Sequence, residues 1–300
     1  MANANLEAEA DLYCASCGIA EVDDIKLMEC DACDLVQYCS DECQEDHLPN
    51  HEAACKERAA ELRDDKLFRQ PESSYMGDCP ICCLPLPIDP QKSMIHSCCS
   101  KIICDGCSYA SKLREREARL QQTCPFCRHP TPATQEEADV NYMKRAEAND
   151  PNALGEMVTR RYEEGDYDTA FEYWTKAAEL GDAISHYKLS LFYYQEGEGV
   201  EKDEMKELFH LEEAAIAGHP DARCNLGCYE VIDERFDRAV KHLIIAANLG
   251  HYKATRALKV CYAEGQVSKE EFATALRAHQ AAVNATKSRQ REKAAAADCY

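Results

Sequence analysis

The segment Ala177-Ala178-Glu179-Leu180-Gly181-Asp182 recurs along the C-terminal half of this 300-residue chain. Its copies are Ala214-Ala215-Ile216-Ala217-Gly218-His219, Ala246-Ala247-Asn248-Leu249-Gly250-His251 and the fainter Ala281-Ala282-Val283-Asn284. The spacings of 37, 32 and 35 residues are typical of two-helix solenoid repeats. An alanine pair lets two helices approach closely, and the glycine after it ends a helix. This half of the chain is therefore predicted to be an all-α solenoid.

Bulky residues precede each alanine pair at helical spacing. They step i, i+4, i+7, i+11 at Tyr167, Phe171, Trp174 and Ala178, and again at Phe236, Val240, Leu243 and Ala247. We expect this stripe to form the solenoid core, with Phe171, Trp174 and Leu243 buried. The pattern resembles a Sel-like repeat, a relative of the tetratricopeptide repeat. The resemblance implies stacked helix pairs whose concave face binds other proteins.

Composition limits the classes of partner. The formal net charge is −21, which disfavours nucleic acid and anionic membrane surfaces, because both are bound mainly through Lys and Arg. No apolar run approaches the roughly 18 residues of a membrane span. The polar N-terminus, Met1 to Asp11, lacks the basic and then apolar pattern of a signal peptide. We therefore expect a cytoplasmic or nuclear protein with reduced thiols.

The chain has 20 cysteines, and 16 of them lie between Cys14 and Cys127. In a reducing compartment such density indicates metal binding rather than disulfides. The predicted fold class is multidomain: two small zinc-stabilised modules, α+β or irregular, followed by an all-α two-helix-repeat solenoid. The predicted boundaries are a disordered tail 1–11, a zinc finger 12–56, a helical linker 57–77, a second finger 78–130, a linker 131–150, repeats 151–285 and a flexible tail 286–300.

The first cysteine block offers eight ligands in four pairs: Cys14/Cys17, Cys30/Cys33, Cys39/Cys43 and His51/Cys55. A C-x-x-C turn can place two thiolates on one zinc ion at about 2.3 Å, and so can ligands one helical turn apart. So short a block, with few large apolar residues, cannot build a stable core alone. Metal is therefore expected to supply its folding free energy.

The stretch Gln37-Tyr38-Cys39-Ser40-Asp41-Glu42-Cys43-Gln44 and the following His51 and Cys55 resemble a MYND zinc finger. The resemblance implies two interleaved zinc sites: Cys14, Cys17, Cys39 and Cys43 for one ion, and Cys30, Cys33, His51 and Cys55 for the other. His47 is off the ligand spacing. The family binds short proline-rich peptides, but Leu48 stands where it usually has Trp. With eleven acidic residues and one Lys, this finger should prefer a neutral or basic peptide to DNA.

The second cysteine block has the pairs Cys79/Cys82, Cys98/Cys99, Cys104/Cys107 and Cys124/Cys127. It resembles an all-cysteine RING finger. The resemblance implies one zinc on Cys79, Cys82, Cys104 and Cys107, and a second on Cys98, Cys99, Cys124 and Cys127. His96 competes with the Cys98/Cys99 pair, and Cys83 is a spare thiol. Four zinc ions are thus expected, two per finger.

A RING finger binds a ubiquitin-conjugating enzyme and orients the ubiquitin thioester, without covalent chemistry of its own. The resemblance assigns contacts with the conjugating enzyme to Ile81, Pro125 and Arg128. Alternatively, Ile81 and Pro125 pack the zinc loops and Arg128 is simply solvated. Segment 109–122 is predicted to be a helix whose four basic residues form a solvated face: Lys112, Arg114, Arg116 and Arg119.

No Gly-rich phosphate loop or Ser/His/Asp elbow motif is present in the sequence. Cys224 and Cys228 have helical spacing but no partner pair, which favours a core role. The expected function is that of a RING-type ubiquitin ligase or ligase-associated adaptor, with no covalent catalytic residue. Its partners would be a conjugating enzyme and protein substrates or scaffold proteins. The alternatives are a non-catalytic interaction scaffold and a MYND-dependent transcriptional cofactor.

Overall fold

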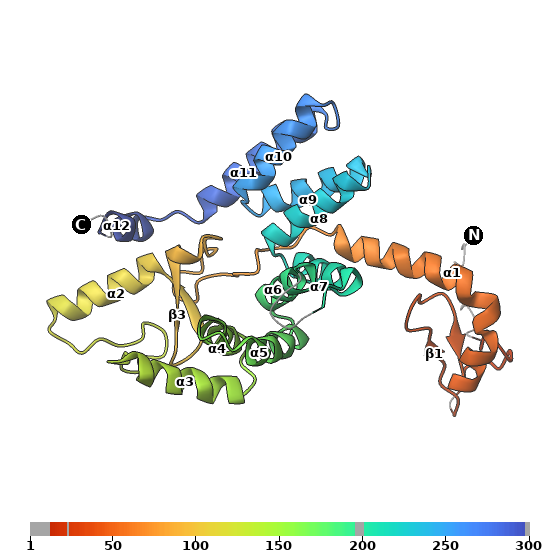
Figure 1. Ribbon diagram of the computed structural model, residues 1–300, viewed down its shortest axis with the longest axis horizontal. Helices are drawn as coiled ribbons and strands as arrows, with labels where there is room; N and C mark the ends of the chain where they lie inside the picture. Colours follow the sequence, from red (N-terminus) through yellow and green to blue (C-terminus); the bar gives the residue numbers. More distant parts are fainter. Residues whose placement is uncertain (1–12, 23, 196–200, 298–300) are drawn as a thin grey trace, which may run out of the picture. The chain divides into compact units, whose positions relative to one another are not determined.

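The computed structural model describes residues 13–22, 24–195 and 201–297 (Figure 1). The chain divides into two compact units, Met1–Arg69 (unit 1) and Gln70–Tyr300 (unit 2). The disordered tail predicted for residues 1–11 lies outside the described residues. Among the described residues, no helix combines the length and apolar character needed to cross a bilayer.

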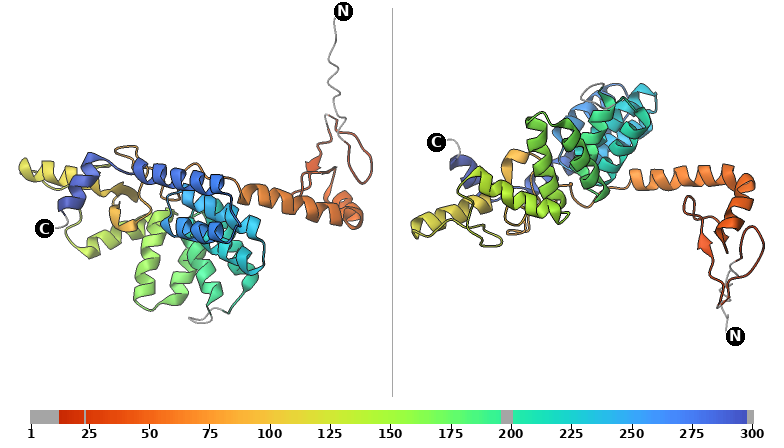
Figure 2. Two further views of the ribbon diagram at one scale, coloured as in Figure 1. Left: turned by 90° about the horizontal axis from the view of Figure 1, so that it is seen from above. Right: turned by 60° about the horizontal axis from the view of Figure 1, so that its bottom comes forward.

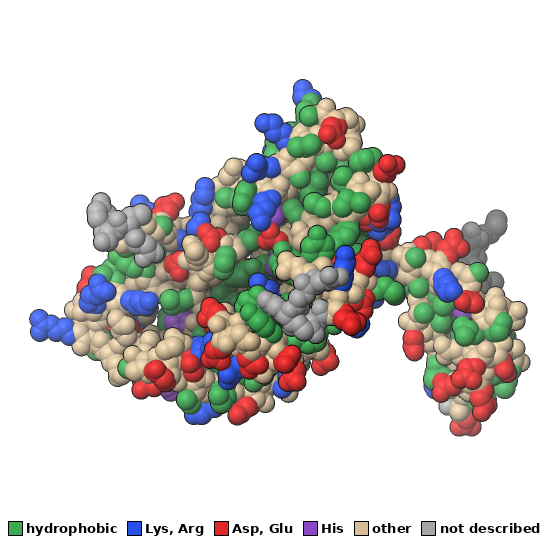
Figure 3. Space-filling view, in the orientation of Figure 1, with side chains coloured by type: hydrophobic (Ala, Val, Ile, Leu, Met, Phe, Trp, Pro, Cys, Tyr) green, Lys and Arg blue, Asp and Glu red, His purple; other side chains and the backbone are tan. Residues whose placement is uncertain are grey.

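The described part of unit 1 consists of loops, a two-stranded sheet and one long helix. Strands β1 (Met28–Glu29) and β2 (Gln37–Tyr38) pair antiparallel, with Met28 opposite Tyr38. Helix α1 (Asp41–Leu67) begins where the Ser40 hydroxyl accepts a hydrogen bond from the Cys43 N–H (3.3 Å). Acidic side chains cover more of the visible face of this unit than basic ones do (Figure 3).

Helix α1 joins the predicted finger and the predicted linker helix into one element. Its residues after Pro49 include no Gly or Pro, and they are mostly good helix formers. Its buried residues are His51, Cys55 and Leu67. Two of these three are candidate metal ligands, so packing of apolar side chains contributes little to holding α1 in place.

Unit 2 begins with the second cysteine block. After the short 3₁₀ helix η1 (Pro90–Lys92), strands β3 (Ser93–His96) and β4 (Lys101–Cys104) form an antiparallel hairpin. Helix α2 (Asp105–Glu117) follows directly, starting and ending four or more residues before the helix predicted at 109–122. Leu86 and Ile103 are buried beside the cysteines, so this module has only a small apolar core.

The helices from α3 to α11 pack as antiparallel neighbours (Figure 2). They are α3 (Gln135–Glu147), α4 (Pro151–Glu163), α5 (Tyr167–Glu179), α6 (Ala183–Tyr194), α7 (Glu204–Ile216), α8 (Pro220–Ile232), α9 (Phe236–Asn248), α10 (Tyr252–Ala263) and α11 (Lys269–Ala285). From α4 to α11 they form four helix pairs, so the predicted all-α solenoid is confirmed. Trp174 and Leu243 are buried in it and Phe171 is half-buried.

The repeated Ala-Ala-x-x-Gly segment ends the second helix of three pairs. Ala214 and Ala215 are fully buried at the end of α7. Gly218 then takes the left-handed conformation (φ 87°), and its N–H and that of His219 donate to the Ala215 and Ala214 carbonyls. This is the Schellman arrangement, which requires a residue that tolerates positive φ. A Cβ at Gly218 would also lie 2.9 Å from the Ser73 carbonyl oxygen.

Two segments predicted to be a linker and a flexible tail contain helices. Residues 131–150, expected to be a linker, contain α3, which the Thr134 side chain caps and whose Tyr142 hydroxyl donates to the Ile95 carbonyl (3.4 Å). The tail from residue 286, expected to be flexible, contains α12 (Arg289–Ala297), with Ala294 buried and α2 as its neighbour. Both helices are stabilised by contacts with the second cysteine block, which local sequence does not reveal.

His219 is buried between two tyrosine rings in unit 2. It stacks on Tyr187 and on Tyr75, with ring centroids 4.3 and 4.7 Å apart. Its Nδ1 accepts a hydrogen bond from the Ala222 N–H at the start of α8 (3.3 Å). The Tyr75 N–H donates to the Gly218 carbonyl (3.2 Å). Burial lowers the pKa of His219 to about 4, so the ring is neutral in the folded chain at neutral pH.

His219 should make the stability of the repeats depend on pH. Because its pKa is below the ordinary value of 6.5, the unfolded chain binds the extra proton between about pH 6.5 and about pH 4. The stability that the neutral His219 ring contributes is fully present above this window. It is lost as the pH falls through the window, and the free energy of unfolding decreases by at most about 1.4 kcal/mol per pH unit. His219→Asn keeps a capping acceptor but does not titrate.

Urea unfolding of both proteins at about pH 6.5 and about pH 4.5 tests this expectation. Zinc loss at acid pH affects both proteins equally, so the difference between them isolates the histidine. The variant should lose less stability on acidification than the wild type. Equal losses would contradict the assignment.

Candidate metal centres

In the part of the chain that the structure describes, four groups of side chains converge so that the ligand atoms of each group all lie within 4.8 Å of one another. We call them tetrads 1 to 4. In chain order they are Cys14, Cys17, Cys39 and Cys43 (tetrad 1); Cys30, Cys33, His51 and Cys55 (tetrad 2); Cys79, Cys82, Cys104 and Cys107 (tetrad 3); and Cys98, Cys99, Cys124 and Cys127 (tetrad 4). These are the sets that the two family resemblances imply.

A common backbone turn presents four of the five C-x-x-C pairs, whereas Cys104 and Cys107 lie at the start of α2. The residue after the second cysteine has a positive φ, and its N–H donates to the carbonyl of the first cysteine. The four such residues are Gly18, Asp34, Cys83 and Arg128. Three of them are not glycine, so the strained conformation costs about 1–2 kcal/mol at each. The turn brings both sulfur atoms of a pair to the same side. A metal ion bound between them would offset the cost of this strained backbone.

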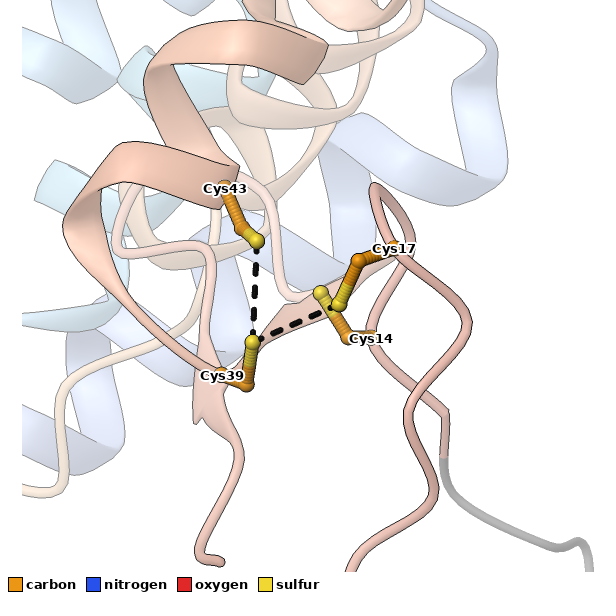
Figure 4. A group of neighbouring side chains, drawn as sticks. All are labelled: Cys14, Cys17, Cys39 and Cys43. Atoms are coloured by element: carbon orange, nitrogen blue, oxygen red, sulfur yellow. Dashed lines mark hydrogen bonds between the residues drawn. The ribbon is translucent and has the colours of Figure 1, made fainter.

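Tetrad 1 is assembled from a loop and the start of α1. Cys14 and Cys17 come from the N-terminal loop, Cys39 follows β2, and Cys43 lies in the first turn of α1 (Figure 4). The Cys17–Cys39 and Cys39–Cys43 sulfur separations are 3.5 and 3.6 Å. A zinc tetrahedron with Zn–S of 2.3 Å has edges of about 3.8 Å. The sulfur atoms are therefore spaced for one ion and too far apart for disulfides.

Tetrad 2 combines three thiols with one imidazole. Cys33 Sγ lies 3.1 Å from His51 Nε2, and the Cys30 and Cys55 sulfur atoms are 3.8 Å apart. His51 and Cys55 sit one turn apart in α1 and are both buried. His47 stacks on His51 but bonds through Nδ1 to the Tyr38 hydroxyl (3.1 Å), and it belongs to none of the tetrads.

The electrostatics of tetrad 1 favour a bound cation. Hydrogen bonding with the Cys17 thiol raises the pKa of Cys39 to about 12. For Cys14 burial acts in the opposite direction, but backbone N–H groups lower the pKa to about 6. One thiolate thus forms readily, and its negative charge opposes ionisation of the neighbouring thiols. A divalent ion removes this opposition because it stabilises all four thiolates, so these residues fit zinc.

Tetrads 3 and 4 lie around the β3–β4 hairpin and α2. The Cys82–Cys104 sulfur separation is 3.9 Å, and the Cys98–Cys127 and Cys99–Cys124 separations are 3.3 and 3.7 Å. Burial, the largest effect, raises the pKa of both Cys98 and Cys107, and neighbouring thiols add to it. Both tetrads therefore repeat the spacing and electrostatic character of tetrad 1.

The structure brings Cys98 and Cys99 together, not His96. His96 lies at the end of β3, outside tetrad 4, and burial lowers its pKa. Its Nε2 is buried without a hydrogen-bond partner in the part of the chain that the structure describes. The spare thiol, Cys83, is exposed.

The three residues predicted to contact a conjugating enzyme all lie on the C-x-x-C turns of the second block. Ile81 is 41% exposed, and Pro125 is partly exposed. Arg128 is exposed, and its guanidinium makes no hydrogen bond or ion pair with any residue of the ranges described. The basic residues of α2 are exposed as well, as expected of a solvated face.

Two residues that support the second block had not been predicted from sequence. Glu115 of α2 is buried and accepts from the Thr123 hydroxyl (2.6 Å), next to Cys124. Arg291 of α12 donates to Cys82 Sγ (3.5 Å). A buried glutamate on an otherwise charged helix has no sequence signal, and Arg291 is 209 residues from Cys82. Cys224 contacts His251 Nδ1 (3.1 Å) and, like Cys228, is in no tetrad.

Comparisons with known proteins identify two parts of the chain. The MYND finger family model matches residues 14–55, and the Sel1 repeat model matches residues 153–182, 183–219 and 233–251. The first part is thus a zinc-binding MYND finger, and the second consists of Sel1 repeats. Neither match covers the second cysteine block, so its likeness to a RING finger stays a prediction. No curated protein matches the chain significantly.

Two solved structures are similar to about half of this chain. One is a protective antigen of uropathogenic Escherichia coli with an SLR fold, at 23% identity and a TM-score of 0.41. The match covers 50% of this chain and 34% of that chain. The other is a Sel1 repeat protein from Oxalobacter formigenes, at 26% identity and a TM-score of 0.43, covering 49% of this chain and 65% of that one. This chain therefore spans about a third and about two thirds of their lengths.

Proposed function

We propose that this chain is a zinc-dependent RING-type ubiquitin ligase or ligase-associated adaptor. The observation that carries the proposal is the interleaving of tetrads 3 and 4. Pairs one and three along the second block form one tetrad, and pairs two and four form the other. This crossed arrangement is what a RING finger needs to turn two loops into one rigid surface.

Zinc would have a structural task in this module. Tetrads 3 and 4 would hold one ion each, and the ions would supply the cross-links that a small apolar core cannot. The loop containing Ile81 is attached to tetrad 3, and the loop containing Pro125 and Arg128 is attached to tetrad 4. Metal binding would therefore set the position of all three side chains.

The three side chains suit a protein that orients its partner rather than reacts with it. Ile81 and Pro125 offer exposed apolar surface for a conjugating enzyme. The Arg128 guanidinium, which has no partner among the described residues, can donate to two carbonyl groups at once, which suits a residue that bridges the enzyme and ubiquitin. Holding the thioester in one reactive pose lowers the entropic cost of transfer, and no proton transfer by this chain is required.

The other modules would select what is modified. MYND fingers and Sel1 repeats are generally protein-interaction modules, and both are present in this chain. The net charge of −21 favours partners that are neutral or basic. Substrate or scaffold proteins would therefore bind the finger and the repeats while the conjugating enzyme binds the second block.

An autoubiquitination assay with a panel of conjugating enzymes tests the proposal. Ile81→Ala and Arg128→Ala should each reduce chain formation by at least about tenfold, because each removes a contact worth about 1.4 kcal/mol or more. Arg119→Ala is a matched control, since Arg119 is also exposed and also has a positive φ (53°, against 60° at Arg128). Leu120→Ala, with a side chain that is 62% exposed, is the control for Ile81.

The metal content should remain unchanged in all four variants. If no enzyme of the panel supports chain formation by the wild type, the ligase proposal is wrong. A non-catalytic interaction scaffold, which the MYND finger and Sel1 repeats support by themselves, would then be the function.

A further inference from the structure

The C-terminal helix α12 reaches the loop that carries tetrad 3. The Arg291 guanidinium donates through Nη1 to the Pro85 carbonyl (2.6 Å) and through Nη2 to the Leu84 carbonyl (3.2 Å). Nη2 also lies 3.5 Å from Cys82 Sγ. A third carbonyl, that of Thr286, accepts from Nη1 (2.6 Å) and ties the guanidinium to the chain just before α12. One side chain thus connects the C-terminal region, a loop carbonyl pair and a candidate zinc ligand.

Helix α12 also lies close to the start of α2, which carries the other two cysteines of tetrad 3. Gly106 lies between Cys104 and Cys107, and a Cβ there would be 2.7 Å from the Arg291 backbone nitrogen. Gln290 Oε1 lies 4.0 Å from Cys107 Sγ. Ala294 is buried one turn further along α12. The helix therefore needs glycine at position 106 in order to seat Arg291.

Arg291 has the chemistry that a zinc–thiolate site requires of a neighbour. An ion held by four thiolates carries a net charge of −2, and an N–H donated to sulfur by a cation offsets part of it. The same guanidinium holds the carbonyl groups that follow Cys82, so it also orients the loop. Groups that orient metal ligands in this way typically change metal affinity about 10–100-fold when removed.

We propose that Arg291 is a positioning residue for the zinc ion of tetrad 3, and that α12 is thereby part of this metal site. The inference rests on the proposed function, because it requires tetrad 3 to hold zinc. It makes helix α12 necessary for the stability of the Ile81 loop. Arg291 touches neither substrate nor conjugating enzyme in this scheme.

Zinc retention by the full-length, zinc-loaded chain tests the inference. The protein is titrated with a competing chelator, and free cysteines are alkylated and identified by mass spectrometry. In Arg291→Ala, the cysteines of tetrad 3 should become reactive at about 10–100-fold lower chelator concentration than in the wild type. Those of tetrads 1, 2 and 4 should not change, and they serve as internal references.

Three further variants sharpen the result. Arg289→Ala removes an exposed arginine from the same helix and should behave as the wild type. Gly106→Ala leaves Arg291 and all ligands intact but blocks the approach of α12, so it should release zinc from tetrad 3 as Arg291→Ala does. Arg291→Lys keeps the charge but not the two-pronged donor geometry, so it should restore retention only in part.

A spectroscopic readout separates positioning from general stability. In the cobalt-loaded chain, loss of the N–H···S hydrogen bond in Arg291→Ala should shift the thiolate-to-cobalt charge-transfer band, and Arg289→Ala should leave the band unchanged. Should Arg291→Ala fail to fold, Gly106→Ala decides the question by alkylation.

Three outcomes would overturn the inference. Equal retention by Arg291→Ala and Arg289→Ala would show that Arg291 has no effect on the site. Equal losses from tetrads 3 and 4 would indicate general destabilisation. Tetrad 3 cysteines that are reactive in the untreated wild type would show that no zinc is held there, and the RING-type function would then fail together with the inference. In the first two cases the proposed function stands.

Discussion

Removing zinc is expected to unfold residues 13–67 and the second cysteine block while the repeat helices persist. The buried residues of α1 include two candidate ligands and one leucine, and the core of the second block consists largely of the cysteines themselves. Structural zinc contributes an apparent 10–16 kcal/mol, by order of magnitude, in zinc-finger peptides at neutral pH. The repeats instead bury a continuous set of apolar side chains between neighbouring helices.

Circular dichroism with and without chelator measures this effect. The helical signal should fall by about the share of α1 and α2, which have 27 and 13 residues, and by contributions from the adjoining α12. Thermal unfolding of the remaining signal should stay cooperative. Adding zinc back should restore the loss. Complete loss of helix on chelation would contradict the independence of the repeats, and no change would contradict the role of metal in both blocks.

Replacing His51 with Ala is expected to release one zinc ion, and replacing His47 with Ala to release none. His51 supplies the nitrogen of tetrad 2, 3.1 Å from Cys33 Sγ. With it removed, three thiols remain for a four-coordinate site, and most of the zinc-derived stability of that site is lost. His47 is a matched control, because it lies one turn earlier in α1 and stacks on His51.

The stoichiometry is best measured by native mass spectrometry of the intact chain. His47→Ala should keep the full metal content but lower the stability of unit 1 by about 1 kcal/mol, since the Tyr38 hydroxyl loses its partner. Full zinc content in His51→Ala, or zinc loss in His47→Ala, would overturn the assignment of tetrad 2.

Much of the architecture could be predicted from local spacing. The alanine–alanine–glycine period predicts the helix pairs because the reasons for it are local: small residues where helices meet, and glycine where a helix must end. The cysteine pairs could be predicted for a similar reason, because a C-x-x-C turn presents two sulfur atoms to one point. The family resemblances then predict which two pairs share an ion.

Other features could not be predicted from the sequence. Residues 131–150 and 286–300 have no apolar stripe long enough to indicate packing, yet α3 and α12 form where Tyr142 and Ala294 find buried surfaces. The choice of Cys98 and Cys99 over His96 depends on how the β3–β4 hairpin turns. Segment 70–77 contacts the repeats through Tyr75 and His219, which are 144 positions apart.

The sequence by itself determined where helices repeat and which side chains can bind metal, because both depend on residues within a turn or two of each other. Tertiary structure alone decided that α12 packs against the second cysteine block, where Arg291 contacts Cys82 and Gly106 leaves room for α12. Such contacts join residues about 200 positions apart, and their energy comes from burial and hydrogen bonds that exist only after the helices have packed.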